Sequence, residues 1–557
     1  MGFRGKLVLL AASLAALAAQ GAYAAQTTVC TITVNSPDER EMFRRSLPAD
    51  RFRFVELVER GRPDWLASAC REGVRCDVLL ISGHFDDGSE FYSDRLDSRD
   101  ALPVDEMQRV SCSESCPGLF SQLKEVYLFG CNTLNPDALA VASAEIARSL
   151  IRSGHSPADA EALSRVLAER HAESNRDRMR QIFKDVPVIY GFSSKAPLGR
   201  NAAPLLERYF RAGGVAEVAS GKPSERLLGL FAPSSMTVAS GTTDVDPLAA
   251  YRRDVCHFAD DRLSSGQKLA FVHRLLDRDI AEVRMFLDQL EKYVGSLSAV
   301  ERQTPVVAMA LREISQDTAA RGRFLDFARD ADQPSVRARM IELATRLGWL
   351  TPGERHAEIE RMFGDRLARG DIGPADVDLA CTLNRTREFD DVPARLRGAP
   401  TKASAAGRAA ILACLGSGEA HARVLRALTS PDDAEVQVAQ VYLRHRPIVD
   451  AAELRMVAAG IARMPDSGAQ VRALDSLAQH RVSDRESLEE LTRVYLRAKS
   501  VDVQRAVAGI LIRADYQPLA SPERVRALRE HRLRSPDGQD LIDALIRRLQ
   551  RAAAPSA

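Results

Sequence analysis

The sequence predicts an α/β domain with a mostly parallel sheet, followed by an all-α domain. Up to about residue 240, short β-rich runs alternate with helix-like segments, which is the pattern of a parallel sheet with helices on both faces. Beyond that point the chain holds amphipathic helical segments and few convincing strands. A chain of 557 residues also exceeds what a single hydrophobic core supports, so two or more domains are expected.

Five segments of the first half have the composition of strands. The third and fourth are continuous apolar runs, as expected for strands buried on both faces of a sheet. Pro187 places the fifth at an edge or at a strand end, because proline cannot donate a ladder hydrogen bond. The five segments are Thr27–Val34, Phe52–Val58, Asp77–Ser82, Val126–Phe129 and Val186–Tyr190.

Polar start signals introduce the helices between these strands. Ser36-Pro37-Asp38-Glu39 predicts a helix with Ser36 as its cap and Glu39 three residues later, as in a capping box. A second helix is expected over residues 63–71. Two further helical patterns lie within 136–183, one opened by Asn135-Pro136-Asp137 and one by Ser156-Pro157.

A short motif recurs in the helical half of the chain. Each copy begins with valine after a polar turn, and the last three copies are 35 and 32 residues apart. A helical period of this length is typical of α-solenoids, and this half resembles HEAT-like repeats. The resemblance implies a surface for docking a protein substrate or partner. The copies begin at Val336, Val436, Val471 and Val503.

The first residues have the features of an export signal. Arg4 and Lys6 precede an apolar run of 13 residues, which ends before the small-residue sequence Ala22-Tyr23-Ala24. This pattern predicts a signal peptide that is removed after Ala24, and a periplasmic or secreted protein. The alternative is an uncleaved anchor, but the run is shorter than the ~20 residues that span a bilayer. No membrane span is expected after signal removal.

The predicted organisation therefore has five parts: a signal peptide (1–24), an α/β domain (25–240), a linker (241–255), a helical repeat domain (256–550) and a disordered tail (551–557). The charge of the chain is nearly balanced, with 77 basic and 76 acidic side chains. This balance argues against a nucleic-acid binder that works by neutralising phosphates.

Two reactive side chains directly follow predicted strands. Asp77–Ser82 leads into Gly83-His84, and Val126–Phe129 leads into Gly130-Cys131. Ligands of parallel sheets bind at the carboxyl ends of the strands, and consecutive strands are usually neighbours. We therefore expect His84 and Cys131 to face one crevice, where the imidazole would tune the ionisation of the thiol.

The segments CDVLLISGHFDDG and VYLFGCNTL resemble the caspase-like cysteine peptidases, a group that includes caspases, gingipains, clostripain and CHAT domains. The resemblance covers about residues 27–240. It implies that Cys131 is the nucleophile and His84 the general acid/base of a peptidase that needs no metal or other cofactor. It also implies an oxyanion hole of backbone N–H groups near the dyad, for which Gly83, Phe85 and Gly130 are the candidates.

A catalytically inactive, protein-binding scaffold of the same fold is the alternative function. Phe85 follows His84 where the peptidase group has glycine, and Phe129-Gly130 precedes the cysteine where caspases have Gln-Ala. On this alternative, the helical repeats would carry the function.

The loop after His84 suggests a specificity. Residues 85–100 hold six acidic and two basic side chains, including Asp86 and Asp87. Next to the crevice, this charge would favour a substrate with a basic residue at the cleaved position. The alternative is a solvated turn. Ser193 and Ser194 follow the fifth strand at the same edge and are further candidates for substrate binding.

Nine cysteines follow the signal segment, an odd number that leaves one thiol unpaired in an exported protein. Pairing cannot be deduced from the sequence, and Cys30 and Cys256 have no obvious partner. A four-thiol zinc site from Cys70, Cys76, Cys112 and Cys116 is the alternative to two of the pairs, although the spacing is unusual for zinc. The candidate pairs are Cys70/Cys76, Cys112/Cys116 and Cys381/Cys414.

Overall fold

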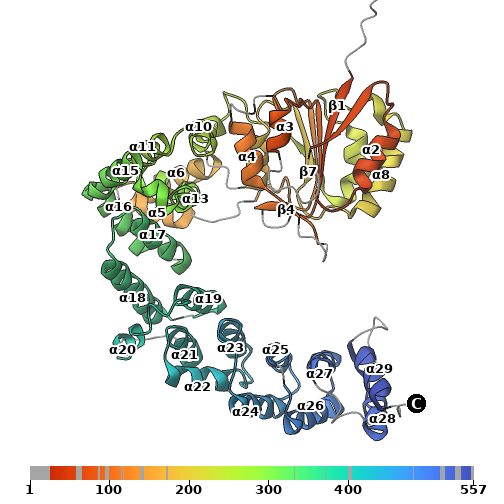
Figure 1. The fold of residues 1–557 in the computed structure, drawn as a ribbon, viewed down its shortest axis with the longest axis vertical. Coiled ribbons are helices and arrows are strands. Elements are labelled where there is room, and N and C mark those ends of the chain that lie inside the picture. The colour runs from red at the N-terminus through yellow and green to blue at the C-terminus, as the bar shows by residue number, and fades with distance from the viewer. Residues whose placement is uncertain are drawn as a thin grey trace, which may run out of the picture. The chain divides into compact units, whose positions relative to one another are not determined.

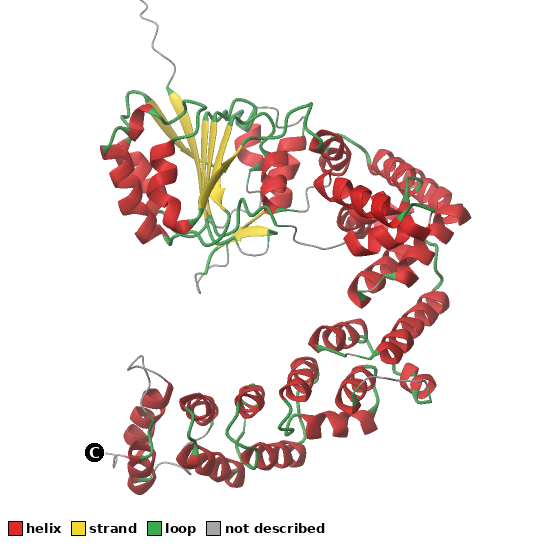
Figure 2. Ribbon diagram, turned by 180° about the vertical axis from the view of Figure 1, so that it is seen from behind, coloured by secondary structure: helices red, strands yellow, loops and turns green. Residues whose placement is uncertain are grey.

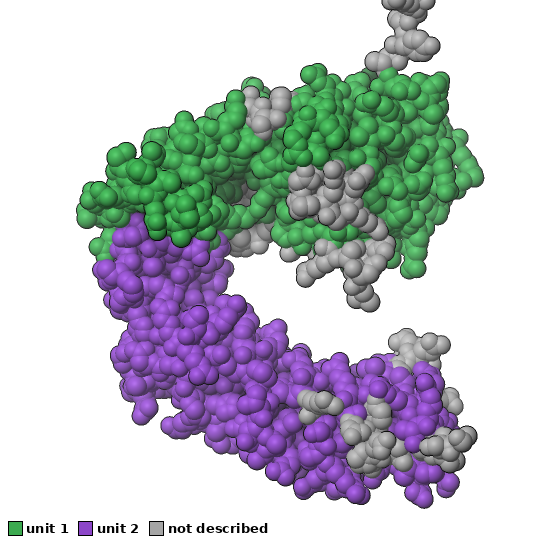
Figure 3. Space-filling view, in the orientation of Figure 1, with its two compact units in different colours: residues 1–323 green, residues 324–557 purple. Residues whose placement is uncertain are grey.

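The fold was obtained as a computed structural model and divides into two compact units, residues 1–323 and 324–557 (Figure 3). Each unit is described by itself. The predicted signal peptide and the last four residues lie outside the described part of the chain. The structure describes all residues except 1–25, 58–65, 86–87, 95–99, 114–115, 117, 138–142, 153, 171–173, 332, 371, 399–403, 481, 515–520, 534–540 and 554–557.

A six-stranded sheet forms the centre of the first unit (Figure 1). The strand order is β2-β1-β3-β6-β7-β8, and every neighbouring pair is parallel except β7 and β8. The mostly parallel sheet predicted from the sequence is therefore confirmed. Its strands are β1 (Thr27–Thr33), β2 (Phe52–Glu56), β3 (Val78–Ser82), β6 (Glu125–Phe129), β7 (Val188–Phe192) and β8 (Met236–Ala239).

Three strands were not predicted. β8 is a four-residue strand that closes one edge of the sheet, and β4 (Glu90–Tyr92) pairs with β5 (Ala101–Pro103) in a separate antiparallel hairpin. Each is too short to show a clear alternation of apolar and polar residues. Pro187 directly precedes β7, which lies between β6 and β8, so the strand-end alternative for this proline is the correct one.

Helices cover both faces of the sheet (Figure 2). On each face, an apolar core forms between the sheet and the helices packed on it. Successive strand residues alternate between these cores: Val78 and Leu80 belong to one, and Leu79 and Ile81 belong to the other. This alternation explains why the central strands are continuously apolar. One face is covered by α2 (Asp38–Ser46), α8 (Gly199–Arg211) and α9 (Glu225–Phe231), and the other by α3 (Ala67–Arg71), α4 (Val104–Cys112) and α7 (Asn175–Ile182).

The start of α2 differs from the predicted capping box. The helix begins at Asp38, and the Ser36 hydroxyl accepts a hydrogen bond from the Asp38 amide at 3.2 Å. The Glu39 side chain is buried and accepts a hydrogen bond from Ser82 on β3 instead of closing the cap. Tertiary packing against the sheet therefore overrides the local capping pattern at this position.

The first unit extends well beyond the predicted domain boundary at residue 240. Helix α10 (Leu248–Ala259) begins inside the predicted linker and packs on α4, α6 and α7. Packing and a disulfide between Cys112 and Cys256 hold it against the α/β domain. The other helices of this region are α5 (Ser143–Arg152), α6 (Pro157–Arg170), α11 (Ser265–Leu276), α12 (Ile280–Met285), α13 (Leu287–Ser296), α14 (Ala299–Gln303), α15 (Pro305–Gln316) and α16 (Thr318–Asp330), with 3-10 turns at Gly214–Ala216 and Ala232–Ser234.

The second unit consists of helices that pack in two rows. Helices α19, α21, α23, α25, α27 and α29 contact one another in succession, and α22, α24, α26 and α28 form the other row. The recurring valine motif lies near the starts of α17, α23, α25 and α27, and the last three of these helices belong to the first row. The helices are α17 (Pro334–Arg346), α18 (Pro352–Arg369), α19 (Pro374–Leu383), α20 (Val392–Leu396), α21 (Ala405–Cys414), α22 (Gly418–Ala427), α23 (Asp433–His445), α24 (Ala451–Ala462), α25 (Gly468–Leu477), α26 (Arg485–Arg497), α27 (Val501–Arg513), α28 (Pro522–Glu530) and α29 (Leu541–Ala553).

The polar turns between these helices supply their N-caps. Asp432 accepts a hydrogen bond from the Ala434 amide at 2.9 Å, and Ser467 and Ser500 cap α25 and α27 in the same way. Each cap satisfies an otherwise unpaired amide at the helix start. The turns noticed in the sequence therefore mark true helix starts. Within the described residues, every helix is too short or too polar to cross a bilayer.

Candidate active site

Strands β3 and β6 are neighbours and run parallel, so their carboxyl ends lie at the same edge of the sheet. Ser82 pairs with Phe129, the last residue of each strand, and the Gly83 amide donates to the Phe129 carbonyl at 3.1 Å. His84 and Cys131 each follow two residues after this last pair. The neighbouring strands expected from the sequence are thus confirmed, and they bring the backbones of both predicted catalytic residues to one edge.

Gly130 lets the segment after β6 come close to the segment after β3 where both leave the sheet. A Cβ atom on Gly130 would lie 2.9 Å from the Gly83 carbonyl oxygen and 2.9 Å from the Phe85 Cβ. No side chain fits at this position without a backbone shift. The Gly83 amide donates to the Phe129 carbonyl and is therefore not free to bind an oxyanion. Phe85 and Gly130 are the other two residues predicted for the oxyanion hole.

Phe85 is a core residue rather than part of an open rim. Its side chain is fully buried and packs on Phe91 of β4, with the ring centroids 4.6 Å apart. Phe91 also lies close to Gly130. Phe85 therefore links the β4–β5 hairpin to the ends of β3 and β6.

The same hairpin surrounds the His84 ring. The backbones of His84 and Tyr92 exchange two hydrogen bonds of 2.9 Å, and their rings lie 5.4 Å apart. His84 Nε2 is shielded from solvent and lies 3.3 Å from Asp94 Oδ2, close enough for an ion pair but not aligned as a hydrogen bond. Asp94 was counted in the sequence only as one acid of the loop.

Cys131 begins a tight turn that is anchored to β7. The next residue, Asn132, has a φ of 58°, and its amide donates to the Ser194 carbonyl at 2.7 Å. The Thr133 hydroxyl donates to the Gly130 carbonyl and accepts from the Phe192 amide. Cys131 itself is half-buried and is a free thiol. The turn therefore has a fixed backbone around a half-buried free cysteine.

The structure describes two of the four predicted substrate-binding residues, Ser193 and Ser194. Ser194 is exposed and touches the Cys131 turn through its main chain, as described above. The Ser193 hydroxyl and amide both donate to the Ser235 carbonyl, so this side chain is engaged with the segment that leads into β8. Asp86 and Asp87 lie outside the described residues.

Glu39 is a residue of this edge that the sequence analysis assigned to a cap. Its carboxyl is buried, and the Ser82 hydroxyl, two residues before His84, donates to it at 3.0 Å. Burial raises the pKa of Glu39 to about 7. The spacing in the sequence could have predicted this burial, because Glu39 lies four residues before the fully buried Phe43, on the same face of α2.

The cysteine pairing corrects two of the three predicted disulfides. Cys381–Cys414 is confirmed, whereas Cys70 and Cys112 pair with residues other than their sequence neighbours. Because every member of the proposed four-thiol zinc site is in a disulfide, that alternative is wrong. The other three bonds are Cys30–Cys76, Cys70–Cys116 and Cys112–Cys256, and they leave Cys131 as the one free thiol among the nine cysteines, all of which are described.

A cleft of about 630 Å³ lies elsewhere in the first unit, beside the Cys112–Cys256 disulfide. Lys184 and Asp185, which precede β7, contribute to its wall together with Arg252. The cleft is therefore at the amino end of β7, whereas His84 and Cys131 follow the carboxyl ends of their strands.

Comparison of the chain with protein-family models, curated proteins and solved structures found no match.

Proposed function

We propose that the protein is an exported cysteine peptidase with a His84/Cys131 dyad, built on a caspase-like α/β domain. The observation that carries the proposal is that Cys131 alone among nine cysteines keeps its thiol, at the end of a strand whose neighbour leads to His84. In a chain with four disulfides, a half-buried thiol on a rigid turn is best explained by a chemical role.

The proposed reaction has two steps. His84 takes the proton of the Cys131 thiol, and the resulting thiolate attacks the carbonyl carbon of a peptide bond; His84 then delivers the proton to the departing amine. A carbon–sulfur bond forms and the carbon–nitrogen bond breaks. Water then attacks the thioester, which releases the acid and restores the thiol. The Asp94 carboxylate, 3.3 Å from His84 Nε2, would help to position the ring for these transfers.

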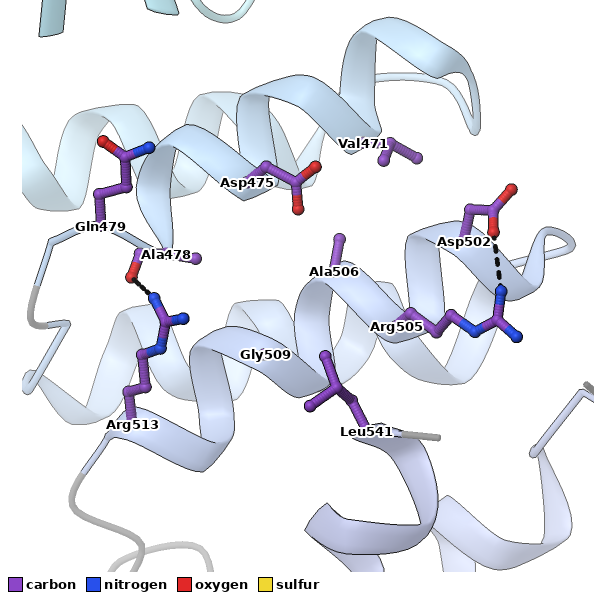
Figure 4. Close-up of a pocket in the computed structure, with 10 residues that line it drawn as sticks. All are labelled: Val471, Asp475, Ala478, Gln479, Asp502, Arg505, Ala506, Gly509, Arg513 and Leu541. Atoms are coloured by element: carbon purple, nitrogen blue, oxygen red, sulfur yellow. Dashed lines mark hydrogen bonds and ion pairs between the residues drawn. The ribbon is translucent and has the colours of Figure 1, made fainter. Parts of the chain in front are cut away.

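The second unit has features of a docking surface, in keeping with HEAT-like repeats. A groove of about 410 Å³ lies between α25, α27 and the start of α29 (Figure 4). Asp475 and Asp502 contribute acidic groups to its wall, and Arg505 and Arg513 contribute basic groups. Arg513 donates to the Ala478 carbonyl at 2.7 Å. A groove with both charges along stacked helices suits a polypeptide segment of a substrate or regulator.

An inactive scaffold is the second candidate function. Phe85 favours it, because this residue is found where the caspase-like pattern has glycine and is committed to the core with Phe91. In that case the fold would hold the free thiol without using it, and the helical unit would carry the binding function.

Thiol labelling under non-reducing conditions separates the two candidates. At neutral pH the full chain should incorporate one alkylating label, at Cys131, and Cys131→Ser should incorporate none. His84→Ala should slow labelling about tenfold or more, because the thiolate loses its proton acceptor. His155→Ala, which removes an exposed imidazole near the start of α6, is the matched control and should label at the wild-type rate. Equal rates for His84→Ala and wild type would contradict the dyad and favour the scaffold.

A further inference from the structure

Three side chains that suit a metal ion converge in the helical part of the first unit. His273 is in the last turn of α11, and Asp277 is the C-cap of the same helix. Asp317 ends α15 and precedes α16. The i,i+4 spacing places His273 and Asp277 on one face of α11, and the contact between α11 and α15 brings Asp317 to them.

The geometry of the cluster is compact. His273 Nε2 lies 3.2 Å from Asp317 Oδ2, and one donor atom from each of the three residues lies within 4.8 Å of the others. Asp317 Oδ1 accepts a hydrogen bond from the Ala320 amide at 2.9 Å, which fixes the carboxylate and leaves Oδ2 for His273.

The electrostatics of the cluster favour a cation. Asp277 is the C-cap of α11, where the helix end carries partial negative charge and disfavours a carboxylate, whereas Asp317 joins the end of α15 to the start of α16 and accepts a hydrogen bond from the Ala320 amide. Arg323 lies 3.6 Å from Asp277 Oδ1 and offsets part of this charge. Arg278, the residue after Asp277, binds Asp254 and Glu282 instead. Two helix ends and two carboxylates therefore meet around one imidazole.

This cluster differs from the other histidine–carboxylate pairs of the described residues. The other pairs each have a single carboxylate: His84 with Asp94, His356 with Asp391, His421 with Glu453 and His445 with Asp378. Among the residues that the structure describes, His273 is in the one group with a third ligand-type side chain within reach. An ion pair with one carboxylate accounts for each of the other pairs, whereas His273 has two carboxylates within reach.

We propose that His273, Asp277 and Asp317 form a binding site for a divalent transition-metal ion, with Zn²⁺ as the best match. One imidazole nitrogen and two carboxylate oxygens are ligands that Zn²⁺ accepts, and water would complete a four-coordinate site. Bonds of about 2.0–2.2 Å place tetrahedral donors roughly 3.3–3.5 Å apart, close to the separation of His273 and Asp317. The exposed Asp277 carboxylate would move inward on binding. The site would join the end of α11 to the α15–α16 turn.

Calorimetric titration of the full, untagged chain with Zn²⁺ tests the site. One equivalent should bind, and His273→Ala and Asp277→Asn should each weaken binding about tenfold or more. Asp317→Asn should weaken it as well, although the asparagine oxygen can still cap α16. His445→Ala, which breaks a similar pair with one carboxylate, should leave the affinity unchanged. Ca²⁺ and Mg²⁺ should bind far more weakly, because the imidazole is a poor ligand for them.

Replacing Zn²⁺ by Co²⁺ tests whether the metal is bound by the Cys131 thiol instead. The Co²⁺ protein should have visible ligand-field bands that His273→Ala removes, without a near-ultraviolet thiolate-to-metal band. Zn²⁺ should also raise the melting temperature of the wild type but not of His273→Ala, whose melting temperature without metal shows that it is folded. Failure of the wild type to bind Zn²⁺, binding that survives in His273→Ala, or a thiolate band would each overturn the proposal. None of these outcomes depends on peptidase activity.

Discussion

At the scale of single residues, Glu39 shows how burial changes the chemistry of a side chain near the candidate site. A carboxyl in the first turn of a helix normally stays ionised and interacts with free amides. Here α2 packs against the sheet, so Glu39 is almost completely buried and its pKa rises to about 7. Because it touches Ser82 at the end of β3, its ionisation is linked to the strand that leads to His84.

Replacing Glu39 by glutamine should stabilise the protein at alkaline pH. The folded-state pKa of Glu39 lies above its ordinary value of 4.5, so the native state disfavours the ionised form. The resulting loss of stability is absent below about pH 4.5, grows as the pH rises toward 7, and is complete above it. Glu39→Gln should therefore gain up to about 3 kcal/mol at about pH 8.5 and nothing near pH 4.

Urea unfolding at several pH values measures this difference. Glu41→Gln is the control, because Glu41 is on the same helix in a surface ion pair with Arg40 and should change stability by less than about 1 kcal/mol. A gain for Glu39→Gln that did not depend on pH would contradict the assigned ionisation.

Gly130 lies where the segment after β6 passes close to the segment after β3. Alanine there would bring Cβ to 2.9 Å from a backbone oxygen, which cannot move without distorting β3. Gly130→Ala should cost about 1–3 kcal/mol in the free energy of unfolding. Gly229→Ala is a matched control, because an added Cβ meets nothing within 4 Å and the position is inside α9. It should be neutral or stabilising by about 0.5–1 kcal/mol. Equal effects of the two substitutions, measured by denaturant unfolding, would refute the steric argument.

At the scale of elements, the prediction of strands succeeded where the core dictates the composition. The apolar runs ending at Ser82 and Phe129 form β3 and β6, the buried central strands. Shorter elements could not be predicted, because β4, β5 and β8 have three or four residues and owe their conformation to the partners they pair with. β4 pairs with the segment at His84. A strand that the sequence did not predict therefore contributes to the candidate site.

The Cys112–Cys256 bond should be the main covalent tie between α10 and the α/β domain. It joins residues 144 apart, whereas Cys381–Cys414 joins residues 33 apart in the second unit. The loop-entropy argument predicts a loss of about 5 kcal/mol for the first bond and about 4 kcal/mol for the second. Replacing Cys112 and Cys256 by serine should accelerate amide hydrogen exchange in α10 and leave α21 unchanged.

The reciprocal variant is the control for this experiment. Replacing Cys381 and Cys414 by serine should accelerate exchange in α19 and α21 while α10 keeps its protection. If neither double variant changed exchange in its own region, packing rather than the disulfides would hold these helices.

At the scale of the whole molecule, charge is balanced overall but uneven locally. The chain carries a formal charge of +1, yet residues 85–100 have six acids against two arginines. Of these acids, Asp94 lies against His84, and Glu90 and Asp100 belong to the described residues of the same hairpin region. Long-range steering by the net charge is therefore negligible, and any preference for a charged substrate must come from this local field.

The proposed peptidase should consequently favour a basic residue at the cleaved position. Arginyl reporter peptides should give a kcat/KM above that of aspartyl and alanyl reporters, and the difference should shrink at high salt. Cys131→Ser should abolish all three activities. Cleavage of the three reporters at equal rates would show that the acidic loop is a solvated turn without a role in specificity.

The sequence by itself determined the class of each half, the central strands and the two chain positions that carry the candidate chemistry. These properties depend on local periodicity and on which residue follows a strand, and both are encoded within a few neighbouring residues. The tertiary structure decided the cysteine pairing, the burial of Glu39, the approach of Asp94 to His84 and the boundary after Arg323. Each of these depends on contacts between segments far apart in the chain, for which a single sequence holds no local signal.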